Sequence, residues 1–91
     1  MTNEEVLKSI EEKYETFSWI PHANSFETVS NGVTIQVIKK DSGILICFSE
    51  PFNYKKIYKF PCDCNIYNKI GEYWFKIRIA KSNTMVSRAL K

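Results

Sequence analysis

The stretch that most constrains the fold runs from residue 71 to residue 81, with the sequence GEYWFKIRIAK. Its odd positions are aromatic or β-branched: Tyr73, Phe75, Ile77 and Ile79. Its even positions are Trp74, Lys76, Arg78 and Ala80. A two-residue alternation is typical of a β-strand with one buried face, and these apolar residue types suit such a surface. We therefore predict a strand inside a sheet, with the odd positions in the core and Lys76 and Arg78 exposed.

An amphipathic helix is predicted over residues 3–17. Thr2 and Glu5 have the spacing of a capping box, in which each side chain bonds the backbone N–H of the other residue. Apolar residues then recur every three or four positions, which places them on one side of a helix. We expect this stripe to face the core: Val6, Leu7, Ile10, Tyr14 and Phe17. Pro21 ends the helix before a connection over residues 18–25.

Four short strands are predicted between this connection and the alternating stretch. They cover residues 26–30, 33–38, 44–49 and 54–60. The predicted turns between them are Asn31-Gly32, which favours a type I′ hairpin, Asp41-Ser42-Gly43 and Glu50-Pro51-Phe52-Asn53. Because these turns are short, neighbouring strands are expected to be antiparallel.

The end of the chain is predicted to hold a short helix over residues 85–90, after a segment at 62–70 that reads as a loop or an irregular strand. Ser82-Asn83-Thr84 can cap that helix. Its apolar residues are expected to face inward: Met85, Val86, Ala89 and Leu90. The predicted fold class is α+β, with an N-terminal helix packed on an antiparallel meander of four to five strands and a short C-terminal helix. One face of the sheet packs the first helix and the other meets solvent.

Length and composition predict one globular domain over residues 1–91, because 44% of the residues are hydrophobic and 25% are charged. No run of about 18 apolar residues occurs, so no membrane span is predicted. The acidic, amphipathic N-terminus differs from a signal peptide. Three cysteines, an odd number, fit a reducing compartment better than a disulfide scaffold. We expect a cytoplasmic protein.

No catalytic signature is visible in the sequence. The one histidine, His22, follows Pro21 in a connection, and there is no phosphate-binding glycine loop or nucleophile motif. Cys62 and Cys64 could form a Cys3His zinc site with Cys47 and His22, although zinc motifs usually pair their ligands two to four residues apart. Three reduced thiols are the simpler interpretation. We predict no enzyme activity, no cofactor and no metal, and the zinc alternative stays open.

Charge is divided unevenly along the chain. Residues 1–27 carry six Glu and two Lys, a net charge of −4, whereas residues 28–91 carry eleven basic and four acidic residues, a net charge of +7. From Lys76 onward there are five basic residues and no acidic one. Such separation attracts and orients partners of complementary charge. The abundance of Lys, Ile, Asn, Tyr and Phe, which have AT-rich codons, favours a phage, viral or bacterial source by association.

The predicted function is non-catalytic binding to a larger protein with an acidic surface, of the kind by which a phage or mobile element inhibits a host system. Trp, Tyr and Arg are enriched in interface hot spots. The predicted binding residues lie on the solvent side of the sheet and at its C-terminal margin: Trp74, Lys76, Arg78, Tyr54, Lys56, Tyr58 and Arg88.

Three alternatives stay open for this surface. A nucleic-acid-binding module would use the same lysines on phosphates and the same aromatic rings on bases. The second alternative is structural, because lysines also protect sheet edges from aggregation. In that case Tyr54, Lys56 and Tyr58 could face the helix and not the solvent. A homodimer is the third alternative.

Overall fold

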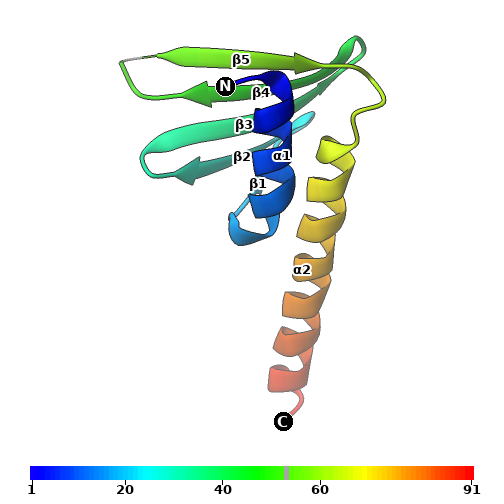
Figure 1. Ribbon diagram of the computed structural model, residues 1–91. Helices are drawn as coiled ribbons and strands as arrows, with labels where there is room; N and C mark the ends of the chain where they lie inside the picture. The colour runs from blue at the N-terminus through cyan, green and yellow to red at the C-terminus, as the bar shows by residue number, and fades with distance from the viewer. Residues whose placement is uncertain (53) are drawn as a thin grey trace.

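The structure is a computed structural model that describes residues 1–52 and 54–91. It contains one five-stranded antiparallel sheet, in which each strand pairs with its neighbour along the chain (Figure 1). The strands are β1 (Ile20–Pro21), β2 (Ser25–Ser30), β3 (Val33–Lys40), β4 (Gly43–Ser49) and β5 (Lys55–Phe60). The helices are α1 (Asn3–Lys13), the 3₁₀ turn η1 (Tyr14–Thr16) and α2 (Ile66–Ala89). The predicted α+β meander with an N-terminal helix is confirmed.

Helix α1 begins as the sequence predicts. The Glu5 amide donates to Thr2 Oγ1 at 3.2 Å, and the Thr2 amide donates to the Glu5 carboxylate at 3.1 Å. The hydrogen bond from the Thr2 backbone lowers the pKa of Glu5, because it favours the charged carboxylate. All five residues of the predicted apolar stripe face the core: Val6 and Ile10 are buried, and Leu7, Tyr14 and Phe17 pack against them.

Two glycines shape the sheet. Asn31 and Gly32 have φ values of 53° and 78°, which fit the predicted type I′ turn between β2 and β3. Gly43 has φ 144°, and a Cβ at this position would overlap the carbonyl oxygen of Phe60 on β5. Only glycine therefore fits at the start of β4. The turn predicted over residues 50–53 includes Asn53, which lies outside the described residues.

The core lies between one face of the sheet and the two helices. Phe26, Val37 and Ile46 are opposite one another on β2, β3 and β4, and all three are buried. They meet Val6 and Ile10 of α1 and Ile66 and Ile70 of α2. Both helices cover this face, so the opposite face meets solvent as predicted (Figure 1).

The strand predicted over residues 71–81 is wrong, because these residues lie within the 24-residue helix α2. Residues two apart on a helix are about 200° apart around its axis, so a helix that is apolar on two opposite sides also shows a two-residue alternation. Tyr73 and Ile77 are half-buried against the domain, whereas Phe75 and Ile79 are 57% and 45% exposed. Phe75 and Ile79 are therefore not core residues. Lys76 and Arg78 are exposed, as predicted.

The short C-terminal helix predicted over residues 85–90 is the end of α2, and the segment over 62–70 is a turn followed by the start of α2. Because α2 runs straight away from the sheet, its end does not fold back onto the core. The four residues expected to face inward are exposed: Met85, Val86, Ala89 and Leu90. That part of the prediction is wrong.

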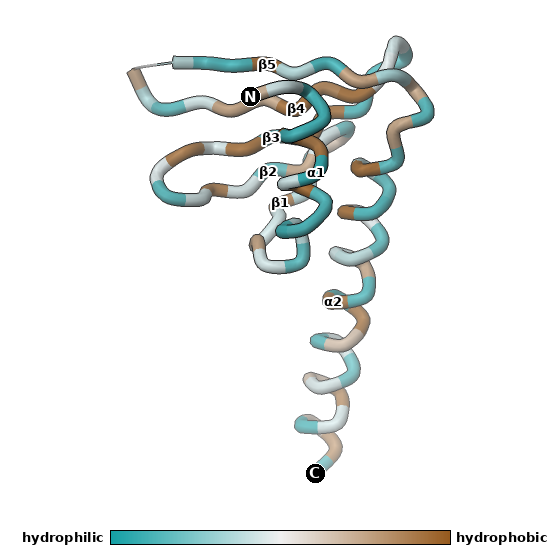
Figure 2. Tube along the Cα trace, viewed as in Figure 1, coloured by the Kyte–Doolittle hydropathy of each residue, from teal (hydrophilic) through white to brown (hydrophobic). Residues whose placement is uncertain are grey.

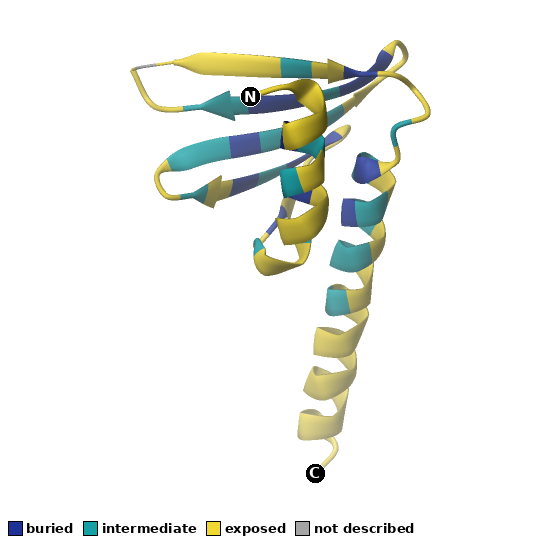
Figure 3. Cartoon of the chain, viewed as in Figure 1, coloured by how far each residue is buried: buried dark blue, intermediate teal, exposed yellow. Residues whose placement is uncertain are grey.

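Helix α2 has two parts, the packed half (residues 66–77) and the projecting half (residues 78–89). Burial falls along the helix, and every residue from Arg78 onward is exposed (Figure 3). The radius of gyration is 15.1 Å, compared with about 12 Å for a compact chain of this length. The projecting half accounts for this elongation. Across the described residues, no helix is long and apolar enough to cross a membrane.

Candidate functional site

An open groove of about 470 Å³ lies between the connection that follows α1 and one side of α2. Residues 15–19 form one wall, and the other wall contains residues of both halves of α2. The apolar lining consists of Phe17, Trp19, Trp74, Ile77 and Met85. The charged side chains of the lining are Glu15, Arg78 and Lys81. The groove therefore combines aromatic surface with a mainly basic rim.

The first wall is fixed by Trp19. The indole Nε1–H donates a hydrogen bond to the Tyr14 carbonyl oxygen at 2.8 Å. The ring packs edge to face on Phe17, with 5.7 Å between the ring centroids, and only 7% of Trp19 is exposed. A buried Trp with its N–H satisfied holds the connection in one conformation.

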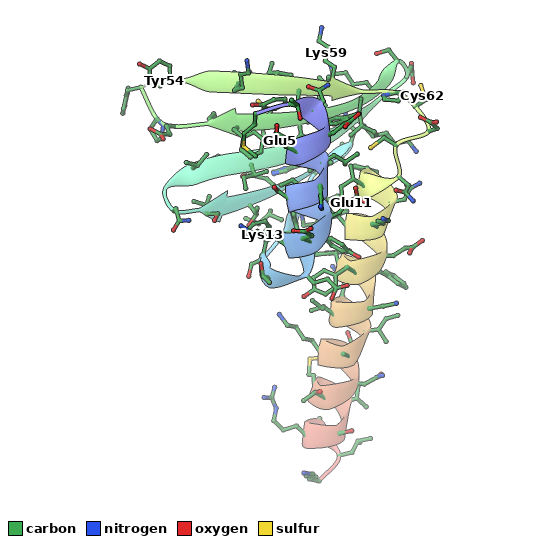
Figure 4. All side chains as sticks on the ribbon, viewed as in Figure 1. Glu5, Glu11, Lys13, Tyr54, Lys59 and Cys62 are labelled. Carbon is green, nitrogen blue, oxygen red and sulfur yellow. The ribbon has the colours of Figure 1, made fainter. Side chains whose placement is uncertain are left out.

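The second wall is attached to the first by two contacts of the packed half of α2. The Tyr73 hydroxyl donates to the Glu15 carbonyl oxygen at 2.6 Å, and the Tyr73 ring meets Tyr14 edge to face at 5.8 Å. Lys69 Nζ of α2 lies 2.9 Å from the carboxylate of Glu11, which is labelled on α1 in Figure 4. The hydrogen bond that Lys69 donates to the Glu11 carboxylate raises the pKa of Lys69, and loss of solvent raises the pKa of Tyr14. Lys69 is therefore charged and Tyr14 neutral near pH 7.

Trp74 and Arg78 lie one helical turn apart and form the centre of the groove. The Trp74 ring is half-buried and packs against Phe26, with 6.4 Å between the centroids. The Arg78 guanidinium carbon is 5.3 Å from the centroid of the Trp74 ring, which is a cation–π distance. Lys81 follows at the next turn on the same side. The ring is thus held by the core, while the two cations remain exposed.

The predicted binding residues do not form one surface. Trp74 and Arg78 share the groove, and Arg88 lies beyond it at a shallow depression with Lys81 and Met85. Lys76 lies on the other side of α2, next to Glu15 and Tyr14. The prediction of a shared sheet face is wrong because residues 71–81 are helical and cannot lie beside β5.

The three predicted residues near β5 occupy the far end of the molecule. Tyr54 is 84% exposed and directly precedes β5, away from the projecting half of α2 (Figure 4). Tyr58 is half-buried and meets Phe48 edge to face at 5.9 Å, with Lys56 Nζ 5.6 Å from its ring centroid. Phe48 belongs to the residues packed against the core, so Lys56 and Tyr58 are on the helix-covered side, as the alternative interpretation expected.

Of the described groove lining, the predicted site included only Trp74 and Arg78, and the larger side chains that it missed include Phe17, Trp19, Lys81 and Met85. Phe17 was expected to face the core from the first helix, and it packs there while also lining the groove. Lys81 and Met85 join Trp74 and Arg78 only when residues 74–85 are read as a helix, because the three- and four-residue intervals then place them on one side.

The cysteines and the histidine do not converge on one centre. Cys47 is buried in β4, Cys62 donates a weak S–H hydrogen bond to the Asp41 carbonyl oxygen at 3.3 Å, and Cys64 is half-buried. His22 Nε2 lies 3.8 Å from the Glu27 carboxylate. Within residues 1–52 and 54–91, no group of three or more His, Cys, Asp or Glu residues could hold a metal ion.

Comparisons of the chain with protein-family models, with curated proteins and with solved structures found no match.

Proposed function

We propose that this protein is a non-catalytic binding module whose groove takes up an acidic segment of a larger protein. The observation that carries the proposal is the pairing of Trp74 with Arg78, 5.3 Å apart, in a groove lined by further aromatic residues. Trp and Arg are the residue types most enriched in interface hot spots. The compositional bias of the chain extends the proposal to phage or mobile-element inhibitors that occupy a host protein.

The groove has the properties that such recognition needs. Its walls are attached to each other through Tyr73 and Glu15, so little ordering is required on binding. An apolar side chain of the partner can contact Phe17 and Trp74, while neighbouring carboxylates face Arg78 and Lys81. Charges on the rim act mainly on orientation and association rate, and the apolar centre supplies the affinity.

Two further observations support a binding role in the cytoplasm. The described groove lining contains neither Cys nor His, so no hydroxyl or thiol of the lining can pair with an imidazole base there. All three cysteines are free thiols, and a reducing compartment keeps them so.

The test compares two aromatic truncations at opposite ends of the molecule. A partner is captured from the native cell with the wild-type chain, purified, and titrated against Trp74→Ala and Tyr54→Ala. We expect Trp74→Ala to weaken binding about thirtyfold, which corresponds to about 2 kcal/mol for a buried hot spot, and Tyr54→Ala to bind as the wild type. If Tyr54→Ala weakens binding and Trp74→Ala does not, the partner binds near β5 and the groove is not the binding site.

Nucleic-acid binding is the alternative, and salt separates it from protein recognition. Binding through several lysines to phosphates weakens steeply as salt rises, because condensed counterions are released. Labelled DNA and RNA oligonucleotides are titrated by anisotropy at two salt concentrations, with the Lys55/Lys56/Lys59 triple alanine variant as the comparison. Tight, salt-sensitive binding that this variant loses would replace the proposal.

A further inference from the structure

The two edge strands of the sheet are protected to different extents. The edge strand β1 has two residues, one of which is Pro21. Such a short strand offers few hydrogen-bonding groups to another chain. The edge strand β5 has six residues, contains no proline, and pairs with β4 in an unbroken register from Lys55 to Phe60. β5 is therefore the edge to which another strand can be added (Figure 1).

The outer edge of β5 is formed by the backbone groups of residues 55, 57 and 59. The Glu50 amide donates to the Tyr54 carbonyl oxygen at 3.1 Å, so this pair occupies a hydrogen-bonded position between β4 and β5. Hydrogen-bonded and non-bonded pairs alternate along an antiparallel ladder. The N–H and C=O groups of residues 55, 57 and 59 therefore point away from β4.

One of these outward groups is already bonded. The Lys59 carbonyl oxygen accepts a hydrogen bond from the Asn3 side-chain amide at 2.8 Å, which agrees with its outward direction. The backbone groups of Lys55 and Ile57 and the N–H of Lys59 are the ones that another strand can use. A strand added there would continue the main-chain ladder of the sheet.

Three lysines give this edge a positive charge: Lys55, Lys56 and Lys59. Their cross-strand neighbours on β4 are uncharged, and these are Ser49, Phe48 and Leu45, respectively. Across the part of the chain that the structure describes, none of the three lysines forms an ion pair. Hydrophilic teal accordingly covers much of β5, whereas β4 beside it is largely brown (Figure 2).

Two of the lysines flank an apolar residue on the solvent face of the sheet. Tyr58 lies opposite Ile46, which is fully buried on the helix-covered face. Side chains alternate between the two faces of a strand, so Lys55, Ile57 and Lys59 project from the other face, away from the glutamates of α1. Ile57 is 43% exposed. The side chains along this edge therefore form a basic, apolar, basic series.

A second copy of β5 is not suited to this edge. In the antiparallel register centred on Ile57, Lys55 of each copy would lie opposite Lys59 of the other. Like charges directly opposite each other destabilise a strand pair. The lysines thus protect the edge against other copies of the chain. An acidic strand meets no such repulsion, because its carboxylates would lie beside unpaired lysines.

We propose that β5 binds an acidic, extended segment of a partner protein, which adds a sixth, antiparallel strand to the sheet. The segment has an apolar residue opposite Ile57 and carboxylates opposite the three lysines. Main-chain hydrogen bonds hold the segment, and its alternate side chains give the specificity. This edge is separate from the groove, so either site can fail without the other.

The first test titrates isotope-labelled protein with the synthetic peptide TETVEET and follows the amide signals by NMR. We expect the largest changes at the amides of Lys55, Ile57 and Lys59, and the same changes in Trp74→Ala, which alters the groove alone. Absence of changes at about 1 mM peptide, where weak strand addition is still measurable, would overturn the proposal. Changes confined to the groove would overturn it as well.

The second test separates strand addition from simple attraction between opposite charges. In the proposed pairing, the peptide valine N–H faces β5 and the N–H of the next glutamate faces away. N-methylation of the valine should weaken binding at least about tenfold, whereas N-methylation of that glutamate should change it less than about threefold. Equal effects would show that the lysines attract any anion, nucleic acid included, and would overturn the proposal. A larger effect at the glutamate would also overturn it.

The third test changes the edge itself. Ile57→Pro removes an N–H that points out of the sheet and leaves the bonds to β4, a position at which edge strands accept proline. We expect this variant to lose peptide binding while circular dichroism shows it folded, and the control Ile57→Val to bind as the wild type.

A charge variant keeps the test decisive if Ile57→Pro does not fold. Lys55→Glu/Lys59→Glu should weaken peptide binding at least about tenfold, because like charges would then face each other across the new pair. The control Lys76→Glu/Lys91→Glu makes the same change in net charge away from β5 and should bind as the wild type. Undiminished binding by Lys55→Glu/Lys59→Glu, or by a folded Ile57→Pro, would overturn the proposal.

Discussion

The two halves of α2 are continuous in backbone, yet they differ in what surrounds them. The packed half buries Ile66 and Ile70 completely and is bonded to α1 and η1 through Lys69 and Tyr73. The projecting half makes its hydrogen bonds within the helix, such as the one from Thr84 Oγ1 to the Ala80 carbonyl oxygen at 2.9 Å. An apolar residue stabilises the fold only where other residues cover it. The spacing of apolar residues along the chain does not show which of them are covered.

The largest expected differences in the free energy of unfolding are among alanine variants of three isoleucines on α2. Ile70 is fully buried, Ile77 is half-buried and Ile79 is 45% exposed. Ile70→Ala should lower the free energy of unfolding by about 2–5 kcal/mol, because it leaves a cavity in the core. Ile77→Ala should have an intermediate effect, and Ile79→Ala should cost less than about 1 kcal/mol in dilute solution.

Urea unfolding followed by circular dichroism measures these differences. Equal losses for Ile70→Ala and Ile79→Ala would show that the projecting half is covered even in the monomer.

Two hydroxyl groups give the next contrast. Tyr73→Phe removes a hydrogen bond that joins α2 to η1 and should cost about 1 kcal/mol of unfolding free energy. Thr84→Ala removes a hydrogen bond within the helix while raising helix propensity, so stability should be unchanged or slightly higher. Thermal unfolding of the two variants checks this order, and a larger loss for Thr84→Ala would contradict it.

Amide hydrogen exchange should separate the two halves without any substitution. Amides of residues 70–77 are expected to exchange only on global unfolding, whereas those of residues 82–89 should exchange through local fraying. The measurement is made on dilute protein and repeated at high concentration. Uniform protection along α2 at all concentrations would remove the distinction between the halves.

The smallest effect concerns the ion pair of the packed half. The folded state raises the pKa of Lys69 through the Glu11 hydrogen bond, so the pair stabilises the fold fully below the unfolded pKa of about 10.4. That stability is lost as the pH rises through the higher folded pKa. The pair is partly exposed, so screening by salt makes the effect small. Urea titrations between neutral and alkaline pH should show a weaker alkaline decline for Glu11→Gln than for the wild type.

Apart from β1, which lies in the predicted connection, the sequence predicts the helix and strands of the first 60 residues because local chemistry specifies them. Thr2 with Glu5 marks the start of α1, and Asn31-Gly32 requires the positive φ values that are observed. Residues 71–81 mislead because apolar residues occur on both sides of the helix there. The intervals of four, three and four from Ile66 through Ile70 and Tyr73 to Ile77 are the helical signal that was missed. The groove could not be predicted, since it requires α2 to lie against residues 15–19.

The order of folding follows from two kinds of contact: the pairing of neighbouring strands and the long-range hydrogen bonds of the two terminal helices. Every strand pairs with its neighbour in the chain, so the sheet can form from contacts of short sequence separation. The hydrogen bonds of Asn3 to Lys59 and of Glu15 to Tyr73 instead join residues 56 and 58 positions apart. We expect the sheet to form first and the two terminal helices to dock last. Substitutions at Ile46 should then slow folding, whereas Ile70→Ala should mainly accelerate unfolding, as stopped-flow kinetics would measure.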